Sequence, residues 1–424
     1  MMKSRLISYL QDDFLRHNVI FFIGSMAVAV LNYAYHPIIS RLLSVEEFGE
    51  VQAYFSLIAQ LGIITGVFGR IILNIKTNTT ENDSSDDTVN QLYTLSTLIT
   101  FSIILGLLIG APYIGVLFNL PGYVGLVLTA LILLISIPQT FAKFHLQAEK
   151  KFTQVSISEF LVSIGKILFA ILFILIGTKV AGALAGLLAS VVVGLVYVYP
   201  YTKHVIHHTH LVRPHLSPAI WKELHYGTLI LFATGFATFL FTADILVVRY
   251  FFDSETAGLY AGIATVARII VFATGSVAGV TIAHIKLKNT RIENHMIMHK
   301  AIILVGGMAV TLLLIFSLLP SFIMKILMGE RFLPLANLLP LLSLLMLTVA
   351  LTNLFIMYFL ALRRFVLIPI TLFGSCSIAI MLFMWHNSVQ DIIFGLICGV
   401  GLVFTTLFFL YCFEPKDSSL QVTR

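Results

Sequence analysis

The sequence predicts an all-α polytopic membrane protein with about 12 transmembrane helices, and three observations predict this fold class. Of the 424 residues, 58% are hydrophobic and only 11% are charged, whereas about 25% of the residues in soluble domains are charged. The apolar runs are long and continuous, and a helix needs about 20 apolar residues to cross a bilayer. These runs also lack the period-two alternation of barrel strands, so each span is expected to be helical.

Breaks of charge, proline and glycine divide the chain into apolar segments of membrane-spanning length. In the first half of the chain, the predicted spans are residues 18–40, 51–75, 92–118, 124–147, 155–177 and 181–202. In the second half, they are residues 226–252, 259–285, 299–320, 333–362, 365–387 and 392–413.

A polar stretch between the sixth and seventh spans divides the chain almost in half. The sequence therefore predicts an N-terminal six-helix lobe over 1–202, a cytoplasmic linker over 203–225, and a C-terminal six-helix lobe with a short cytoplasmic tail over 226–424. Six of the 13 histidines lie in the linker, which suggests either a metal site or pH sensor, or simply a solvated connector. We prefer the connector.

The cysteines and the basic residues exclude several function classes. Each of the three cysteines lies inside an apolar run, and their spacing fits neither a disulfide framework nor a metal site: Cys376, Cys398 and Cys412. We therefore expect no metal and no cofactor. The net charge is +6, but the basic residues sit between apolar runs and form no stripe, so nucleic acid is not an expected partner.

The distribution of lysine and arginine predicts the orientation in the membrane. Eighteen of these residues fall in the terminal and connecting segments on the side of the N-terminus, and five fall on the other side. Cytoplasmic segments carry the excess of positive charge. Both termini are therefore predicted to be cytoplasmic, and the lipid bilayer is the first expected partner.

An internal repeat relates the two halves. The segments Ser44–Gly49 (SVEEFG) and Asp253–Gly258 (DSETAG) share the pattern (Ser/Asp)-x-Glu-x-x-Gly at an offset of 209 residues. Each follows an odd-numbered span and opens an even-numbered one, so Ser44 and Asp253 are candidate helix N-caps. Lys150–Phe152 (KKF) and Arg363–Phe365 (RRF) both join the fourth span of a lobe to its fifth. Six spans per lobe preserve orientation, so the lobes are parallel repeats.

The same residues carry a resemblance to a known family. Pro37–Gly49, followed by a glycine-interrupted helix that ends at Phe68–Arg70, resembles the opening of bacterial polysaccharide-export flippases. These proteins belong to the multidrug/oligosaccharidyl-lipid/polysaccharide superfamily. Gly258–Tyr260 and Leu327–Ala336 are similar to the second lobe of that family.

The resemblance implies a fold and a function. The expected fold is two six-helix lobes that form a V around a central cavity, which opens to each side of the membrane in turn. The expected activity is to move undecaprenyl-diphosphate-linked oligosaccharide units, of the O-antigen (lipopolysaccharide) or capsule type, from the cytoplasmic to the periplasmic leaflet of the bacterial inner membrane. A complex with a polysaccharide polymerase is a further implied partnership.

Other functions stay open as alternatives. Within the superfamily these are a multidrug-extrusion antiporter and a lipid II or teichoic-type flippase. A membrane glycan polymerase or ligase is the rival class of enzyme, and such proteins generally have a large periplasmic loop. The longest outside loop predicted here has about twelve residues, and the chain has no zinc-protease motif, nucleophile elbow or phosphate-binding glycine loop. We therefore expect a transporter and not an enzyme.

Five ionisable residues fall inside predicted spans, where each costs about 2.5–3.5 kcal/mol on insertion scales. They are Arg70, Glu159, Lys166, Asp244 and Arg268. The functional hypothesis is that the three basic residues line the cavity and bind the diphosphate and any acidic sugars, because an anion that leaves water needs compensating charge. Asp244 or Glu159 would then couple transport to a proton or a sodium ion.

The alternative for these five residues is structural. Asp244 and Arg268 lie at similar depth in an antiparallel hairpin, and Arg70 and Glu159 lie at similar depth near the cytoplasmic side. Each pair could therefore form a salt bridge that holds helices together. Arg70 and Glu159 could instead extend their side chains to the membrane surface.

Overall fold

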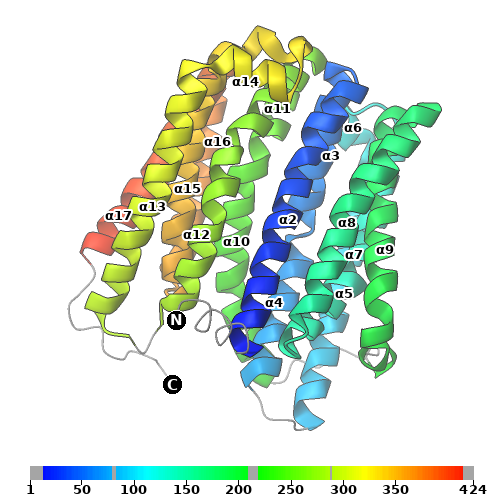
Figure 1. Cartoon of the computed structure of the whole chain (residues 1–424), viewed down its shortest axis with the longest axis vertical. Helices are drawn as coiled ribbons and strands as arrows, with labels where there is room; N and C mark the ends of the chain where they lie inside the picture. Colours follow the sequence, from blue (N-terminus) through cyan, green and yellow to red (C-terminus); the bar gives the residue numbers. More distant parts are fainter. Residues whose placement is uncertain (1–12, 79–82, 209–217, 287–288, 414–424) are drawn as a thin grey trace, which may run out of the picture. The chain divides into compact units, whose positions relative to one another are not determined.

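The computed structural model describes residues 13–78, 83–208, 218–286 and 289–413. Within these ranges the secondary structure is helical and contains no strand (Figure 1). The helices of the first half are α2 (Asp13–Leu42), α3 (Val45–Leu61), α4 (Ile63–Asn78), α5 (Asp83–Ile109), α6 (Ala111–Leu117), α7 (Val124–Ala148), α8 (Phe152–Phe173), the π-helical turn η1 (Ile174–Thr178) and α9 (Lys179–His208).

The second half contains a corresponding series. Its helices are α10 (Pro218–Phe251), α11 (Ser254–Ala267), α12 (Ile269–His284), α13 (Arg291–Leu318), α14 (Pro320–Leu327), the 3-10 helix η2 (Glu330–Leu338), α15 (Leu339–Ala361), α16 (Leu367–Met384) and α17 (Val389–Cys412).

The helices have the lengths that a bilayer requires. By length and composition, ten helical stretches of the described chain are able to cross a membrane. One of them, Phe152–Lys203, has 52 residues, and the chain reverses within it at Gly177, where φ is 92°. This stretch therefore supplies two spans, α8 and α9. The 30-residue helix α2 is also long enough to cross a bilayer, so the number of spans is close to the predicted twelve.

Several predicted spans are each built from two helices. The span predicted at 51–75 is α3 and α4, which meet at Gly62, and its repeat at 259–285 is α11 and α12, which meet at Arg268. The third span of each half breaks before a proline: Pro112 lies in the first turn of α6, and Pro320 begins α14. Proline has no N–H to donate to the preceding turn, so it favours a new helix start. The breaks in the two halves therefore lie within three residues of equivalent positions at the offset of 209 residues.

The predicted helix N-cap at Ser44, the first residue of the repeat motif, is present. The Ser44 hydroxyl accepts a hydrogen bond from Glu47 N, and the Glu47 side chain accepts one from Ser44 N, which together make a capping box. This arrangement satisfies two amide groups that the helix itself leaves without partners. In the second half, α11 begins directly after Asp253, with Glu255 in its first turn.

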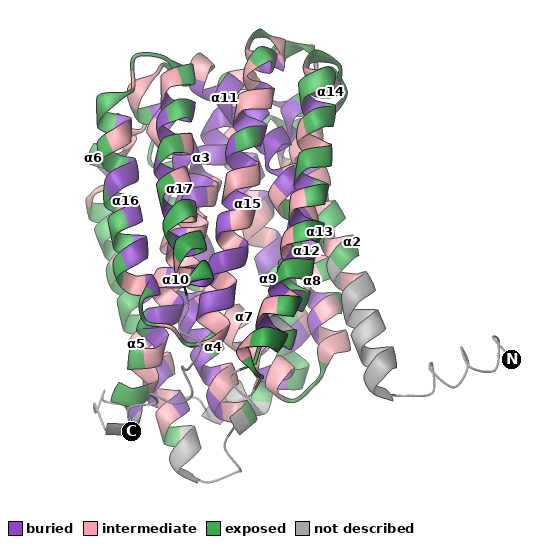
Figure 2. Cartoon of the chain, turned by 90° about the vertical axis from the view of Figure 1, so that its left-hand side faces the viewer, coloured by how far each residue is buried: buried purple, intermediate pink, exposed green. Residues whose placement is uncertain are grey.

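The described chain falls into two compact units. The first runs to Gly227 and adds the short segment Asp253–Gly258, and the second consists of Thr228–Phe252 and the residues from Leu259 onward. In the first unit, α8 packs along α9 and against α2, and α7 packs against α4, α5 and α9. In the second, α15 packs against α12, α13 and α17. Buried residues accordingly run along α15, while α13 and α17 present exposed faces (Figure 2).

The predicted linker is helical at both ends. Helix α9 continues to His208 and α10 begins at Pro218, because polar residues at the end of an apolar run can extend a helix beyond the bilayer. Residues 209–217, which include His210 and His215, lie outside the described residues. The lobe and linker boundaries therefore stay a prediction.

Candidate functional site

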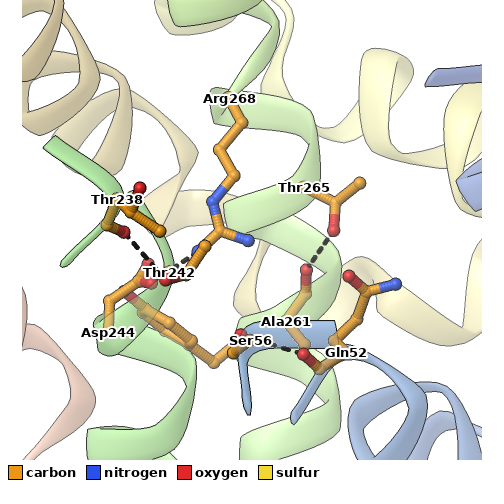
Figure 3. Close-up of polar contacts among 9 residues, drawn as sticks. Gln52, Ser56, Thr238, Thr242, Asp244, Ala261, Thr265 and Arg268 are labelled. Atoms are coloured by element: carbon orange, nitrogen blue, oxygen red, sulfur yellow. Dashed lines mark hydrogen bonds and ion pairs between the residues drawn. The ribbon is translucent and has the colours of Figure 1, made fainter. Parts of the chain in front are cut away.

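A buried ion pair joins α10 to the junction of α11 and α12 in the second unit. Arg268 Nη2 donates a hydrogen bond to Asp244 Oδ1, and the Tyr260 hydroxyl donates one to Asp244 Oδ2 at 2.9 Å. Figure 3 shows Arg268 and Asp244 pointing toward one another. The side chain of Asp244 is 2% exposed and that of Arg268 is 7% exposed. The pairing that the sequence allowed for these two residues is therefore present.

The guanidinium group of Arg268 is only partly satisfied. Its carbon Cζ lies 5.1 Å from the centroid of the Phe241 ring, a geometry that attracts a cation to an aromatic face. Its Nε is buried and has no hydrogen-bond partner in the described structure. The neighbouring hydroxyls of Thr242 and Thr265 donate to carbonyl groups of their own helices, those of Thr238 and Ala261 (Figure 3).

A small cavity lies beside Asp244 within the second unit. Its volume is about 10 Å³, close to the least room that one water molecule needs. Among the described residues that line it, Asp244 is polar and the others are apolar: Phe239, Leu240, Ala243, Val247, Leu345, Leu382, Leu396 and Val400. Asp244 therefore borders a small cavity on the side of α15, α16 and α17.

Lys166 is the buried cation of the first unit. It lies on α8 and is 8% exposed. Its ammonium group donates to Asn32 Oδ1 at 2.8 Å and lies 4.6 Å from the centroid of Tyr35 and 6.0 Å from that of Phe55. Helices α2 and α3 supply these three contacts. Within the described structure no carboxylate pairs with Lys166, so its positive charge is held by a neutral amide and two aromatic faces.

The two remaining predicted residues lie in more open surroundings. Glu159 does not pair with Arg70. Its carboxylate instead binds Lys143 Nζ at 2.9 Å, and the two side chains are 34% and 31% exposed. Arg70, on α4, has an exposed side chain. The structure thus brings Asp244 and Arg268 together and leaves the other three predicted residues at separate places.

Sequence reasoning missed a polar chain at the ends of α4 and α7. Lys76 Nζ lies 3.0 Å from His145 Nδ1, His145 Nε2 lies 2.8 Å from Glu149 Oε1, and Lys151 Nζ lies 2.7 Å from Glu149 Oε2. Burial raises the pKa of Glu149, but the hydrogen bonds and positive charges of Lys151 and His145 outweigh it and hold that pKa below its usual value. The spacing of four residues between His145 and Glu149 would have predicted their contact, because side chains at i and i+4 are neighbours on a helix.

Two further buried charges were also missed. Arg249 is 2% exposed and Glu50 is 7% exposed. Both fall beside predicted turns, where the sequence alone suggests contact with water. Hydropathy places a residue along the membrane normal, but it does not tell whether protein or solvent surrounds the side chain.

Comparison with known families decides the membership of the chain. Residues 14–283, well over half of the sequence, match the family described as "Polysaccharide biosynthesis protein". The chain belongs to this family. The resemblance that Pro37–Gly49 and the second-lobe motifs indicated is therefore confirmed. A search of curated protein sequences gives no match.

Solved structures show which fold the family member has. An inward-facing multidrug resistance transporter of the MATE family has a TM-score of 0.70 at 14% identity, over 93% of this chain and 97% of that one. The lipid II flippase MurJ, in an inward closed conformation, has a TM-score of 0.69 at 12% identity, over 92% of this chain and 87% of that one. A MOP superfamily transporter from Pyrococcus furiosus, whose binding pocket is described as reversed in polarity, has a TM-score of 0.58 at 14% identity, over 94% of both chains. The fold class predicted from sequence is confirmed.

Proposed function

We propose that this protein is a flippase that moves undecaprenyl-diphosphate-linked oligosaccharide units, of the O-antigen or capsule type, from the cytoplasmic to the periplasmic leaflet by alternating access. The observation that carries the proposal is membership of the polysaccharide biosynthesis family on a fold shared with a lipid II flippase. The protein lies in the bacterial inner membrane with both termini cytoplasmic, as the excess of basic residues on that side favours. A complex with a polysaccharide polymerase fits this role.

The diphosphate is bound by buried cations. A diphosphate that leaves water for a low-dielectric site needs positive charge nearby. Lys166 supports this assignment best, because its contacts are neutral and its ammonium charge is not matched by a carboxylate of the described chain. Arg268 supplies a second cation, buried beside Asp244. Arg70 is proposed as a third contact for the polar part of the substrate.

Coupling to a proton or a sodium ion is proposed at a membrane carboxylate. Asp244 is the stronger candidate, because it is buried and borders a cavity. Glu159 is the weaker one, since its partly exposed carboxylate is bound to Lys143. Acidic residues inside membranes commonly form such relays.

Complementation of a deletion strain tests the proposal. The gene is deleted in the native host and replaced by wild type, Lys166→Glu or Arg268→Glu, and the surface polysaccharide is separated on gels. We expect the polymer to disappear in the deletion strain and in both variants, with the level of the Lys166→Glu protein in the membrane unchanged. Charge reversal at exposed lysines provides the matched controls, Lys203→Glu for the first unit and Lys300→Glu for the second.

A second candidate function follows from the likeness to the multidrug transporter. It is tested in the same strains by measuring sensitivity to cationic drugs. Normal surface polysaccharide together with new drug sensitivity in the deletion strain would show that the protein is a multidrug exporter and not a flippase. Normal surface polysaccharide in both charge-reversal variants would show that Lys166 and Arg268 do not bind the substrate.

A further inference from the structure

We propose that Arg268 and Asp244 exchange partners when substrate binds: the guanidinium group leaves the carboxylate for the diphosphate, and the carboxylate takes up a proton. The second unit would then bind an anion and a proton together. This inference rests on the proposed function, because it takes the diphosphate as the anion.

The hydrogen bonds of the pair leave Arg268 with unused donors. Each oxygen of Asp244 already has a donor, Arg268 for Oδ1 and Tyr260 for Oδ2. Arginine, however, has five N–H groups in a planar fork, and Nε of Arg268 is buried without a partner. A phosphate group presents several strong acceptor oxygens and binds arginine through two parallel hydrogen bonds. A phosphate group therefore offers acceptors for N–H groups of Arg268 that the carboxylate leaves unused.

The charges explain why a proton accompanies the anion. Asp244 and Arg268 together carry no net charge, so the pair is tolerated in a buried site. Once Arg268 turns to the diphosphate, Asp244 loses its counter-charge, and an isolated buried carboxylate neutralises itself by binding a proton. The proton is taken from water and stays on a carboxyl oxygen of Asp244, while Arg268 remains positively charged throughout.

Within the described residues, two ionisable side chains contact Asp244. The titratable and charged side chains that face it are Arg268 and Tyr260, which come from the arm formed by α11 and α12. Helices α15, α16 and α17 present apolar side chains to the cavity beside Asp244, those of Leu345, Leu382, Leu396 and Val400. The same cavity borders Asp244 and has room for about one water molecule.

The exchange is tested by measuring the proton uptake that accompanies binding of a diphosphate. Purified protein in detergent is mixed with farnesyl diphosphate in weakly buffered solution near neutral pH, and a pH-sensitive dye reports proton uptake. We expect wild type to take up about one proton per bound diphosphate beyond that of the ligand itself. Asp244→Asn is the matched variant: it keeps an acceptor for Arg268 and is expected to bind farnesyl diphosphate without the additional uptake. Arg268→Gln should bind it at least about tenfold more weakly.

The outcomes separate the exchange from the proposed function. Binding to wild type with the same proton uptake as Asp244→Asn overturns the exchange and leaves the flippase proposal standing. Absence of binding to wild type overturns both the diphosphate as ligand and the exchange. If Asp244→Asn does not fold, calorimetry of wild type in two buffers of different ionisation enthalpy gives the proton count without a variant, and a count of zero again overturns the exchange.

Discussion

Lys150 and Arg363 adopt the same left-handed backbone at equivalent places in the two halves, with φ of 59° and 50°. Each ends the fourth long helix of its half with the same pair of hydrogen bonds. Lys150 N donates to Gln147 O and Lys151 N to Leu146 O, as Arg363 N donates to Leu360 O and Arg364 N to Phe359 O. This is the Schellman arrangement, in which glycine is the usual residue because it has no Cβ. The duplicated KKF and RRF segments therefore share a backbone structure as well as a sequence pattern.

The first prediction concerns this strained position. Lys150→Gly should raise the free energy of unfolding by about 1 kcal/mol, because glycine adopts the left-handed conformation without steric strain. Arg363→Gly should act in the same direction. Thermal unfolding of the detergent-solubilised protein measures the change. Lys150→Ala is the control, because it shortens the same side chain but keeps the Cβ that is strained at this positive φ; stabilisation by this variant of the same size would refute the explanation.

The second prediction concerns the two glycines of the repeated motif. A Cβ on Gly49 would lie 2.6 Å from Gly258 Cα, and a Cβ on Gly258 would overlap the carbonyl oxygen of Val45. Backbone cannot yield as a flexible side chain does, so Gly258→Ala should destabilise the first unit by about 1–3 kcal/mol.

The repeat supplies matched controls for this change. A Cβ at Gly66 or Gly275 meets nothing within 4 Å, so Gly66→Ala and Gly275→Ala should leave stability unchanged or raise it by up to about 1 kcal/mol. The midpoint of thermal unfolding ranks the variants. Equal effects at Gly258 and Gly275 would show that the close backbone contact does not limit stability.

The third prediction separates function from stability at the two buried cations. Lys166→Met should leave the thermal midpoint unchanged or higher, because it removes a buried charge that no described carboxylate compensates. Arg268→Met should lower stability by about 3–5 kcal/mol, because it leaves the charge of Asp244 buried without its partner. Both should abolish surface polysaccharide. A large loss of stability in Lys166→Met would indicate that Lys166 holds the helices together.

The fourth prediction concerns pH at the end of α7. The pKa of Glu149 is lowered in the folded protein, against the effect of burial, by Lys151 and His145. A carboxylate with a lowered pKa stabilises the fold above the pKa that it has when unfolded, and this contribution is lost as pH falls through the folded value. Glu149→Gln should therefore weaken the protein near neutral pH and have little effect in acid. The difference should not exceed about 1 kcal/mol, because the side chain is 39% exposed and solvent screens the pair. A larger effect of the variant in acid than at neutral pH would contradict this sign.

Most helices were predictable because a bilayer imposes a length and a polarity on each span. The apolar run at 124–147 became α7 (Val124–Ala148), and the run at 392–413 became α17 (Val389–Cys412). The ends differ more where polar residues continue the helix, as α10 begins eight residues before the predicted 226. Hydropathy detects the edge of the hydrocarbon region, whereas a helix ends where its capping residues and backbone hydrogen bonds end.

The candidate site was predictable only in part. Depth along the helices correctly allowed Asp244 to meet Arg268, because they lie on neighbouring arms of one hairpin. The same reasoning suggested Arg70 for Glu159, but Lys143 is the partner. Depth gives the position of a side chain along the membrane normal. The neighbour toward which the side chain points depends on the rotation of its helix about the helix axis. Rotation follows from packing against helices distant in sequence.

The sequence by itself determined a duplicated helical membrane protein with a few ionisable groups at bilayer depth, because the hydrophobic effect and backbone hydrogen bonding leave few other structures for such a chain. Only the tertiary structure decided which of those charges are matched. Lys166 meets Asn32, a residue 134 positions away, and two aromatic rings, whereas Arg268 meets Asp244 within its own hairpin. Contacts between distant helices depend on how side chains interlock, and no local pattern in the sequence records that.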